Sequence, residues 1–422
     1  MNMHTRQRTP AEQALIDAFG DRVGDLPGNE DVLIARDTAI EALKEQGLPS
    51  RRVESWHYTD LRTLLRQVPG FDAMAGSGAR PPLIGGACVA AVSNGEAIGT
   101  PKLDGASFRR LGEMLTDGSF APALPPRGPD DAVGEINAAF VSDGWFVDIA
   151  AGANLGAPIE LQLIQESGQG HVRLPVRVGK GARATIFERH LGGEIDAFAT
   201  SVSHLDLADE AEITWVILRD KNEAETELCQ FNARLGANAK LLLFVVNAGG
   251  KLIRHEVHVG VTGEGADFRL RGINLLSGTT HTDVTMTLDH EAEATSSTAI
   301  VRNVVADRAH GCFQGQIRVK QTAQKTDARM ACNSLILSDD AEFSAKPELE
   351  IFADDVQCGH GATVTEIDRD HLFYLMARGV PEREARGLLV KAFVMEIVEE
   401  VEDESIAEAL ADVIEGWLGK HG

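Results

Sequence analysis

Residues 241–261, LLLFVVNAGGKLIRHEVHVGV, contain two short runs of apolar and β-branched residues, 241–246 and 255–261, with Asn and Gly between them. This arrangement is typical of two strands joined by a turn. The same pattern of short runs divided by Gly, Asn or Asp extends from about residue 141 to residue 364, without a sustained helical period. A β-rich stretch of this length predicts a sandwich, a barrel or a solenoid.

A parallel β-helix is the architecture that we predict from this stretch. Aromatic residues make up only 5% of the chain, and thin stacked coils need fewer large side chains than a single bulky core. The expected strand starts near residues 300, 313, 333, 347 and 357 are irregularly spaced, so the sandwich remains an alternative. Further expected strands are 145–149, 159–164, 184–187, 213–218, 317–320 and 349–352.

The N-terminal region is predicted to be helical. Thr9, Pro10 and Glu12 form the signature of a capped helix start. A second helix is expected over residues 31–46, closed by Gly47. Its residues expected to face inward are Leu33, Ile34, Ile40 and Leu43.

The C-terminal region is also predicted to be helical. Asp368 is expected to cap a helix through residue 378 with Gly379 as its stop, Pro381 opens a second helix, and Ser405 with Glu408 caps a third. The domain organisation that follows is a helical or mixed domain at 1–140, a β-helix core at 141–365 and a helical domain at 366–422. Nearly every position from 396 to 415 that is expected to be exposed is acidic, without an intervening Lys or Arg, which indicates either a solvated face or a docking surface for a basic partner.

Charge and cysteine usage exclude several classes of protein. The chain has 40 basic and 64 acidic residues and a formal net charge of −24, so a nucleic-acid partner is not expected. Residues 1–10 lack the apolar core of a signal peptide, and no run is long enough for a membrane span. Five scattered cysteines without a C-x-x-C pair indicate a reducing cytoplasm rather than a disulfide framework, a zinc ribbon or a permanent ferredoxin-like cluster.

Cys358 and His360 are the strongest candidates for chemistry. If 356–364 is a strand, they lie on one side of it with Cβ atoms about 7 Å apart. A thiolate and a neutral imidazole both bind iron, and Gly359 and Gly361 leave room for a cluster or a second backbone. Two ligands do not complete a site, so the others must come from elsewhere, such as a second subunit. The alternative is a buried thiol beside a hydrogen-bonded histidine.

The same region resembles the SufB/SufD family of iron-sulfur cluster assembly proteins. The resemblance lies in KPELEIFADDVQCGHGAT at 346–363, LFYL at 372–375, Arg378-Gly379, and ESWHYT at 54–59. It follows the chain in order and is most specific between about 328 and 395. The sequences at 347–351 and at 360–363, His-Gly-Ala-Thr, are closer to the SufD branch than to SufB.

This resemblance implies a right-handed parallel β-helix between helical domains in a non-catalytic scaffold subunit. It implies pairing with a SufB-like paralogue, or with itself, through the β-helix, and with a SufC-like ATPase through helices at about 368–417. His360 would reach the seam as a ligand of iron or of a transient Fe-S cluster, and Cys358 is the weaker neighbour. Members of the family have been linked to FAD, but no dinucleotide fingerprint occurs here. Gly263 to Gly265 lack a P-loop's Lys and Ser/Thr, so this chain is not expected to hydrolyse ATP, and the resemblance implies that its partner does.

Several other Cys, His and Asp residues are further candidates for metal ligands. Cys332 is similar in context to the ligand cysteine of SufB, so it is either a second ligand near the seam or a chance inward-facing thiol. His255 and His258 are three apart and are expected on opposite faces of a strand. His281 and Asp283 share a face, and we expect them to form surface hydrogen bonds.

Two other functions compete with the scaffold. A β-helix carbohydrate lyase or hydrolase would use acidic residues as acid and base or as calcium ligands, but such enzymes are commonly secreted and line their grooves with aromatic residues. Its candidates here are Asp339, Asp340, Asp354 and Asp355. A structural homodimer without a metal role is the other possibility.

Overall fold

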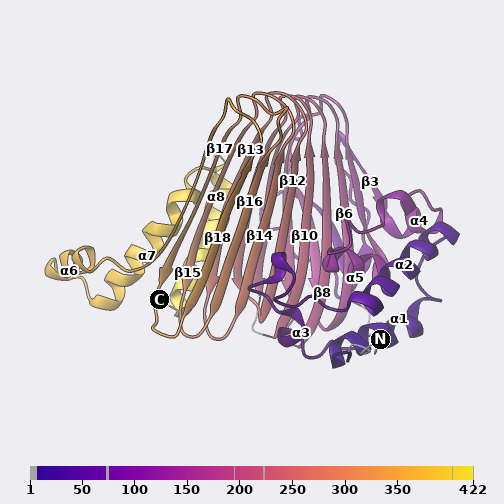
Figure 1. Cartoon of the computed structure of the whole chain (residues 1–422), viewed down its shortest axis with the longest axis horizontal. Helices are drawn as coiled ribbons and strands as arrows, with labels where there is room; N and C mark the ends of the chain where they lie inside the picture. Colours follow the sequence, from indigo (N-terminus) through magenta and orange to yellow (C-terminus); the bar gives the residue numbers. More distant parts are fainter. Residues whose placement is uncertain (1–6, 73–75, 194, 222–223, 402, 422) are drawn as a thin grey trace.

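The computed structural model describes residues 7–72, 76–193, 195–221, 224–401 and 403–421, and Figure 1 shows their arrangement. Most of the polar opening at 1–10 therefore lies outside the described residues. The helices are α1 (Pro10–Arg22), α2 (Glu30–Gln46), η1 (Glu54–Trp56), α3 (Leu61–Leu64), α4 (Leu111–Thr116), η2 (Ala121–Ala123), α5 (Ala132–Phe140), α6 (Arg369–Ala377), α7 (Glu382–Val398) and α8 (Glu404–His421). No helix of the described residues is long and apolar enough to cross a membrane.

The strands form one continuous solenoid. They are β1 (Cys88–Ser93), β2 (Glu96–Ile98), β3 (Ala106–Arg110), β4 (Asp143–Ile149), β5 (Ile159–Gln165), β6 (Gly168–Val178), β7 (Arg183–Gly192), β8 (Ala197–Leu207), β9 (Glu212–Lys221), β10 (Glu225–Leu235), β11 (Lys240–Gly249), β12 (Leu252–Val261), β13 (Asp267–Leu276), β14 (His281–His290), β15 (Ser296–Val305), β16 (His310–Val319), β17 (Asp327–Ile336), β18 (Glu342–Ile351) and β19 (Gln357–Glu366).

Successive strands from β4 to β19 alternate between two sheets. A 10-stranded sheet has the order β19-β17-β15-β13-β11-β9-β7-β5-β1-β2, and a 9-stranded sheet has the order β18-β16-β14-β12-β10-β8-β6-β4-β3. From β4 onward, strands two apart in the chain pair in parallel, and β1 pairs in parallel with β5, whereas β1 with β2 and β3 with β4 pair antiparallel. The prediction of a parallel β-helix is therefore confirmed, and the sandwich alternative is wrong.

The predicted strand starts at 300, 313, 333 and 347 are three to six residues late, because the strands begin at 296, 310, 327 and 342. The irregularity that remains has a structural cause. Along one column of in-register residues the interval is 27 from Asn247 to Asn274, 29 from Asn274 to Asn303, and 31 from Asn303 to Ser334. Coils of unequal length preserve strand register because the extra residues are accommodated in the turns between strands. A fixed sequence period is therefore absent although the coils repeat in space.

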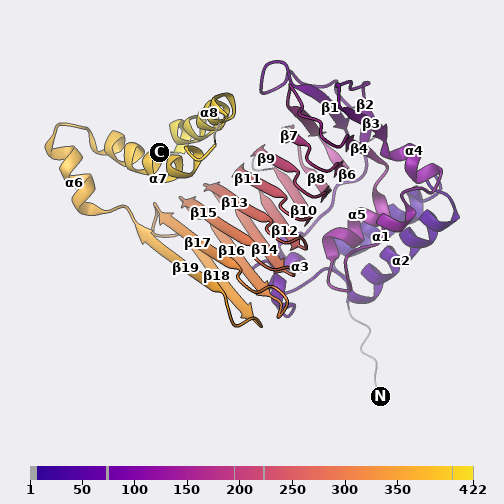
Figure 2. The same cartoon turned by 90° about the horizontal axis from the view of Figure 1, so that it is seen from above.

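Helices cover the outer faces of both sheets, as Figure 2 shows. The N-terminal helices pack over the 9-stranded sheet, in a core that includes Phe198, Leu228 and Leu252 of β8, β10 and β12. The C-terminal helices α7 and α8 pack over the 10-stranded sheet. The apolar residues of that sheet in this second core include Val216, Phe244, Val246, Ile273, Leu275 and Val304.

Local capping signals agree with the structure, while two details of the helices differ from the predictions. Thr9 and Glu12 form the capping box of α1, and Asp368 accepts hydrogen bonds from the first turn of α6. In α2, Leu33 and Ile34 are 37% and 57% exposed, so the prediction that they face inward is wrong.

The start of α8 is the second difference. The side chain of Asp403, not that of Ser405, accepts from the backbone N–H groups of Ser405 and Ile406. A carboxylate two residues upstream is the stronger acceptor for these donors.

Candidate functional site

Cys358 and His360 lie on β19, the outermost strand of the 10-stranded sheet. Cys358 pairs in register with Ala328, and His360 pairs with Met330 of β17. Both partners on β17 are buried in the interior of the β-helix. The two side chains therefore lie on the face of β19 that continues this interior, at its open end.

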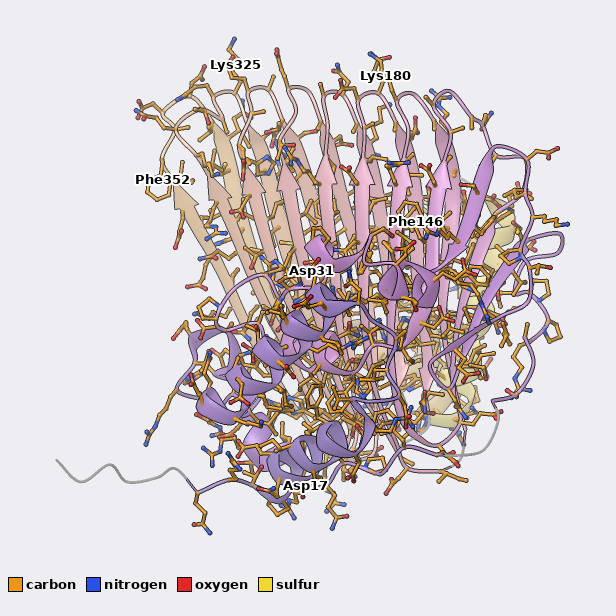
Figure 3. All side chains as sticks on the ribbon, turned by 90° about the vertical axis from the view of Figure 1, so that its right-hand side faces the viewer. Asp17, Asp31, Phe146, Lys180, Lys325 and Phe352 are labelled. Atoms are coloured by element: carbon orange, nitrogen blue, oxygen red, sulfur yellow. The ribbon has the colours of Figure 1, made fainter. Side chains whose placement is uncertain are left out.

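The terminal coil is far more exposed than the coils beneath it. Most residues of β18 are half-buried, and every residue of β19 except Cys358 is exposed. Ile351, Phe352 and Val364 are 41%, 65% and 47% exposed, which leaves apolar surface at this end. Figure 3 places Phe352 at the terminal coil, far from Asp17 and Asp31 in the N-terminal helices.

The chemistry of the two side chains differs. The Cys358 thiol is half-buried against the core, and burial raises its pKa, although a backbone hydrogen bond with Ala328 partly offsets this. His360 is exposed. A Cβ built on either Gly359 or Gly361 meets nothing within 4 Å, so there is open space beside both.

Cys332 lies on β17, one coil below the open end. It pairs in register with Ala362 and is fully buried. Burial raises the pKa of its thiol to about 12, and hydrogen bonds with Asn303 and Ser334 lower it in part. The side chain faces the same interior as Cys358 and His360, since strand residues two apart share a face.

These three residues do not form a complete metal site. Among the described residues, no group of three or more His, Cys, Asp and Glu side chains is arranged to hold a metal ion. A thiol on one strand, with a thiol and an imidazole on the next, supplies donors that suit iron but leaves its coordination incomplete.

The acidic residues of the carbohydrate-enzyme hypothesis are divided between two edges of the β-helix. Asp339 and Asp340 lie in the turn from β17 to β18, whereas Asp354 and Asp355 lie in the turn from β18 to β19. The ten-residue strand β18 between these turns spans about 33 Å, and the paired carboxyl groups of glycosidases are within about 10 Å of each other. An acid and a base drawn from the two turns therefore cannot act on one bond.

His281 and Asp283 are buried, so the prediction of surface hydrogen bonds is wrong. Thr59 of the ESWHYT segment donates to Asp283, and its hydroxyl is 2.9 Å from Nε2 of His281. Arg254 pairs with Asp283 and donates to the backbone oxygen of Ser55 at 2.7 Å. The segment thus fastens the N-terminal helices to the β-helix through buried polar groups. His255 and His258 have separate polar partners, Arg219 and Glu256.

The acidic run at 396–415 is used partly within the chain. Glu396 pairs with Arg302 and Glu400 with Arg271, both on the outer face of the 10-stranded sheet, at 2.5 Å. These pairs lie at the C-terminal end of α7 and just beyond it, next to the buried apolar residues that pack α7 against the sheet. Farther out, α6 has no buried residue, and its Phe373 is 71% exposed. The exposed ring of Phe373 on α6 thus lies next to α7, which packs with α8 against the β-helix.

A polar column inside the β-helix was not predicted from the sequence. Arg219, Asn247, Asn274, Asn303 and Ser334 are buried on adjacent strands at one register position. An inward-facing Asn in a strand gives no signal by itself. Only its recurrence at equivalent places of coils of unequal length could have indicated the column.

Comparison with known proteins identifies a match over more than half of the chain. Residues 163–393 match the family model for the SufBD core domain of the SUF system of FeS cluster assembly. The chain is similar to the iron-sulfur cluster assembly protein SufD of Escherichia coli, with 25% identity over 87% of this chain and 89% of that protein. It is 27% identical to a SufBD family protein of Synechocystis over 89% of each chain, and 29% identical to the chloroplastic protein ABCI7 of Arabidopsis thaliana over 68% of this chain and 63% of that one.

Proposed function

This chain belongs to the SufB/SufD family of iron-sulfur cluster assembly proteins, and from that premise we propose that it is a non-catalytic scaffold subunit that completes a cluster site only with a partner chain. The partner is a SufB-like paralogue, and a second copy of this chain is the alternative. The site lies where the terminal coils of the two β-helices meet.

One observation carries the proposal. Cys358 and His360 lie on a strand whose outer edge pairs with no other described strand. An unpaired edge presents a row of N–H and C=O groups that another chain can complete. Apolar surface at Phe352 and Val364 adds a hydrophobic contribution to such pairing.

His360 is the principal ligand in this proposal because it is exposed at the seam. Cys358 is the second ligand, and its thiol must lose a proton to bind iron. Cys332 joins them only when the terminal coil separates from β17, since it is fully buried in the closed form. Iron and sulfide are the cargo of the site and are transferred onward as a nascent cluster.

The C-terminal helices supply the second interaction. In our proposal a SufC-like ATPase binds the exposed surface of α6 and the adjoining part of α7, where Phe373, Tyr374 and Leu388 are 71%, 57% and 47% exposed. Nucleotide-driven closure of two ATPase subunits would pull on α7. Because buried apolar residues of α7 pack against the sheet, with Glu396 and Glu400 paired to it at the end of the helix, that force is transmitted to the coils and opens the seam.

The experiment is reconstitution of cluster assembly with the full-length protein and the partners that it retains in a pull-down from its native cell. His360→Ala and Cys358→Ser should each lower the cluster yield, measured from absorbance and bound iron, with the double variant lowest. Cys88→Ser is the matched control, because Cys88 is likewise half-buried and lies on β1 at the opposite end. Exposed His57 provides the histidine control as His57→Ala.

Three results would contradict the proposal: an unchanged yield in the double variant, an equal loss in the controls, or a pull-down without a paralogue, a second copy or an ATPase. Complex formation is measured on every variant. A variant that binds its partners normally but yields less cluster supports a ligand role rather than a folding defect.

A further inference from the structure

The polar column inside the β-helix has a defined direction. Nη1 of Arg219 donates to Oδ1 of Asn247 at 3.3 Å, and Nδ2 of Asn247 donates to Oδ1 of Asn274 at 2.7 Å. Nδ2 of Asn274 donates to Oδ1 of Asn303 at 2.7 Å. Every amide in the column therefore points its N–H group toward the open end of the β-helix.

Arg219 determines this direction. A guanidinium has donors but no acceptor, so Asn247 must present its carbonyl oxygen to Arg219 and its NH₂ group to Asn274. The same constraint then passes to Asn274 and Asn303. The anchor itself is held in place, because Arg219 lies between Glu227, at 3.4 Å, and the ring of His190, at 3.3 Å. All five members of the column are at least 95% buried, so water does not compete for these bonds.

The donor end of the column reaches Cys332. Nδ2 of Asn303 lies 3.4 Å from Sγ of Cys332, 3.3 Å from the backbone oxygen of Asn333 and 3.0 Å from Oγ of Ser334. We propose that Asn303, oriented by Arg219, Asn247 and Asn274, is a positioning residue that makes the sulfur of Cys332 a hydrogen-bond acceptor, the role open to a thiolate ligand of iron, which has no proton to donate. An aligned chain of amides strengthens its terminal N–H donor, and N–H···S bonds are one means by which proteins tune iron-sulfur centres.

This inference rests on the proposed function only in assigning the sulfur to iron. The orientation of Cys332 is independent of any metal and is measured in the full-length protein without one. A column that merely held strands in register would stabilise the β-helix without affecting the bonding of one thiol. The S–H stretching band distinguishes the two cases because its wavenumber depends on the hydrogen bonds of the thiol and falls when the S–H group donates.

Raman spectra would be recorded on the full chain, with Cys332→Ala used to assign the S–H band of Cys332. Asn303→Leu should shift that band because the amide donor is lost. Asn247→Leu should shift it to lower wavenumber, because Asn274 then loses the donor that fixes its amide. Once Asn274 turns its carbonyl oxygen toward Asn303, Asn303 presents its own carbonyl oxygen to the thiol and accepts the S–H. If Asn303→Leu does not fold, Asn303→Ser removes the amide with a smaller side chain.

Val245→Ala is the matched control, because Val245 is a buried core residue of β11 two positions before Asn247. The Val245→Ala substitution leaves a cavity in the same coil but keeps the polar column, so the S–H band of Cys332 should stay in place. An unchanged band in both Asn247→Leu and the Asn303 variant would overturn the inference, as would an equal shift in Val245→Ala. A shifted band with unchanged cluster yield would support the column and remove Cys332 from the proposed ligands, while His360 and Cys358 would be judged by their own variants.

Discussion

The guanidinium of Arg254, on β12, lies 4.2 Å from the centre of the Trp56 ring, in the segment that joins the N-terminal helices to the β-helix. The same guanidinium pairs with Asp283 and with Glu256, and the Arg254 side chain is fully buried. Arg254 thus connects the β-helix to the ESWHYT segment, which lies almost two hundred positions earlier in the chain. We call this contact the clasp: the Trp56 ring packs against the Arg254 guanidinium, and Thr59 donates a hydrogen bond to Asp283.

Replacing Arg254 by Met should strongly destabilise the protein. Asp283 and Glu256 would be left as buried carboxylates without their cation, which typically costs about 3–5 kcal/mol. Urea denaturation measures the loss. The control is Arg177→Met, because Arg177 pairs with Asp148 on the surface, where such a pair contributes about 1 kcal/mol or less. Equal losses in the two variants would show that Arg254 is not the centre of the clasp.

Acid should weaken the protein through His171. Burial lowers the pKa of this histidine to about 3, helped by Arg22, whereas its ordinary value is 6.5. Below pH 6.5 the unfolded chain binds a proton that the folded chain does not, so folded stability falls with pH until about pH 3. At pH 5 this cost is on the order of 2 kcal/mol. His171→Gln removes it, so the stability gap between the two proteins should narrow from pH 7 to pH 5. A constant gap would contradict the assignment.

A rise in pH should lower the stability of the protein through Glu135. Burial, with Asp131 and Asp130 nearby, raises the pKa of this carboxyl group from 4.5 to about 8. Between these values the unfolded chain is ionised and the folded chain holds the proton, so stability is lost as pH rises. Glu135→Gln should therefore stabilise the protein at pH 7 by about 2–3 kcal/mol, and by little at pH 4.5. The exposed Glu113 serves as the control as Glu113→Gln. A gain independent of pH would refute the explanation.

Charge placed on the terminal coil should block partner binding without unfolding the chain. Val364→Lys and Phe352→Lys put an ammonium group on the exposed apolar surface of β19 and at the end of β18, and lysine on an edge strand opposes pairing with another sheet. Recovery of the partner in a pull-down should fall at least tenfold. Ile195→Lys is the control because Ile195 is 64% exposed but lies between β7 and β8, away from this coil. Undiminished recovery would place the interface elsewhere.

Much of the fold could be predicted because its signals are local. Short alternating runs such as 255–261 indicate strands, since side chains on a strand alternate between faces regardless of what covers them. The box at Thr9 and the cap at Asp368 satisfy backbone donors within their own first turns. Cys358 and His360 share a face for the same local reason, and the structure places them so.

Other features were decided only by how distant segments meet. Leu33 and Ile34 have the composition of a core face, yet α5 and α1 pack against the other side of α2. Glu396 and Glu400 resemble a solvated acidic run, but Arg302 and Arg271 lie opposite them on the sheet.

The polar interior shows the physical reason for this division. Whether a side chain alternates inward depends on its immediate neighbours, and the sequence alone determines it. Which residue stands beside it depends on the length of each coil, and intervals of 27, 29 and 31 residues bring Asn247, Asn274, Asn303 and Ser334 into one column. Hydrogen bonds between coils act over a few ångströms in space whatever their separation in the chain, so only the tertiary structure sets the donor that faces Cys332.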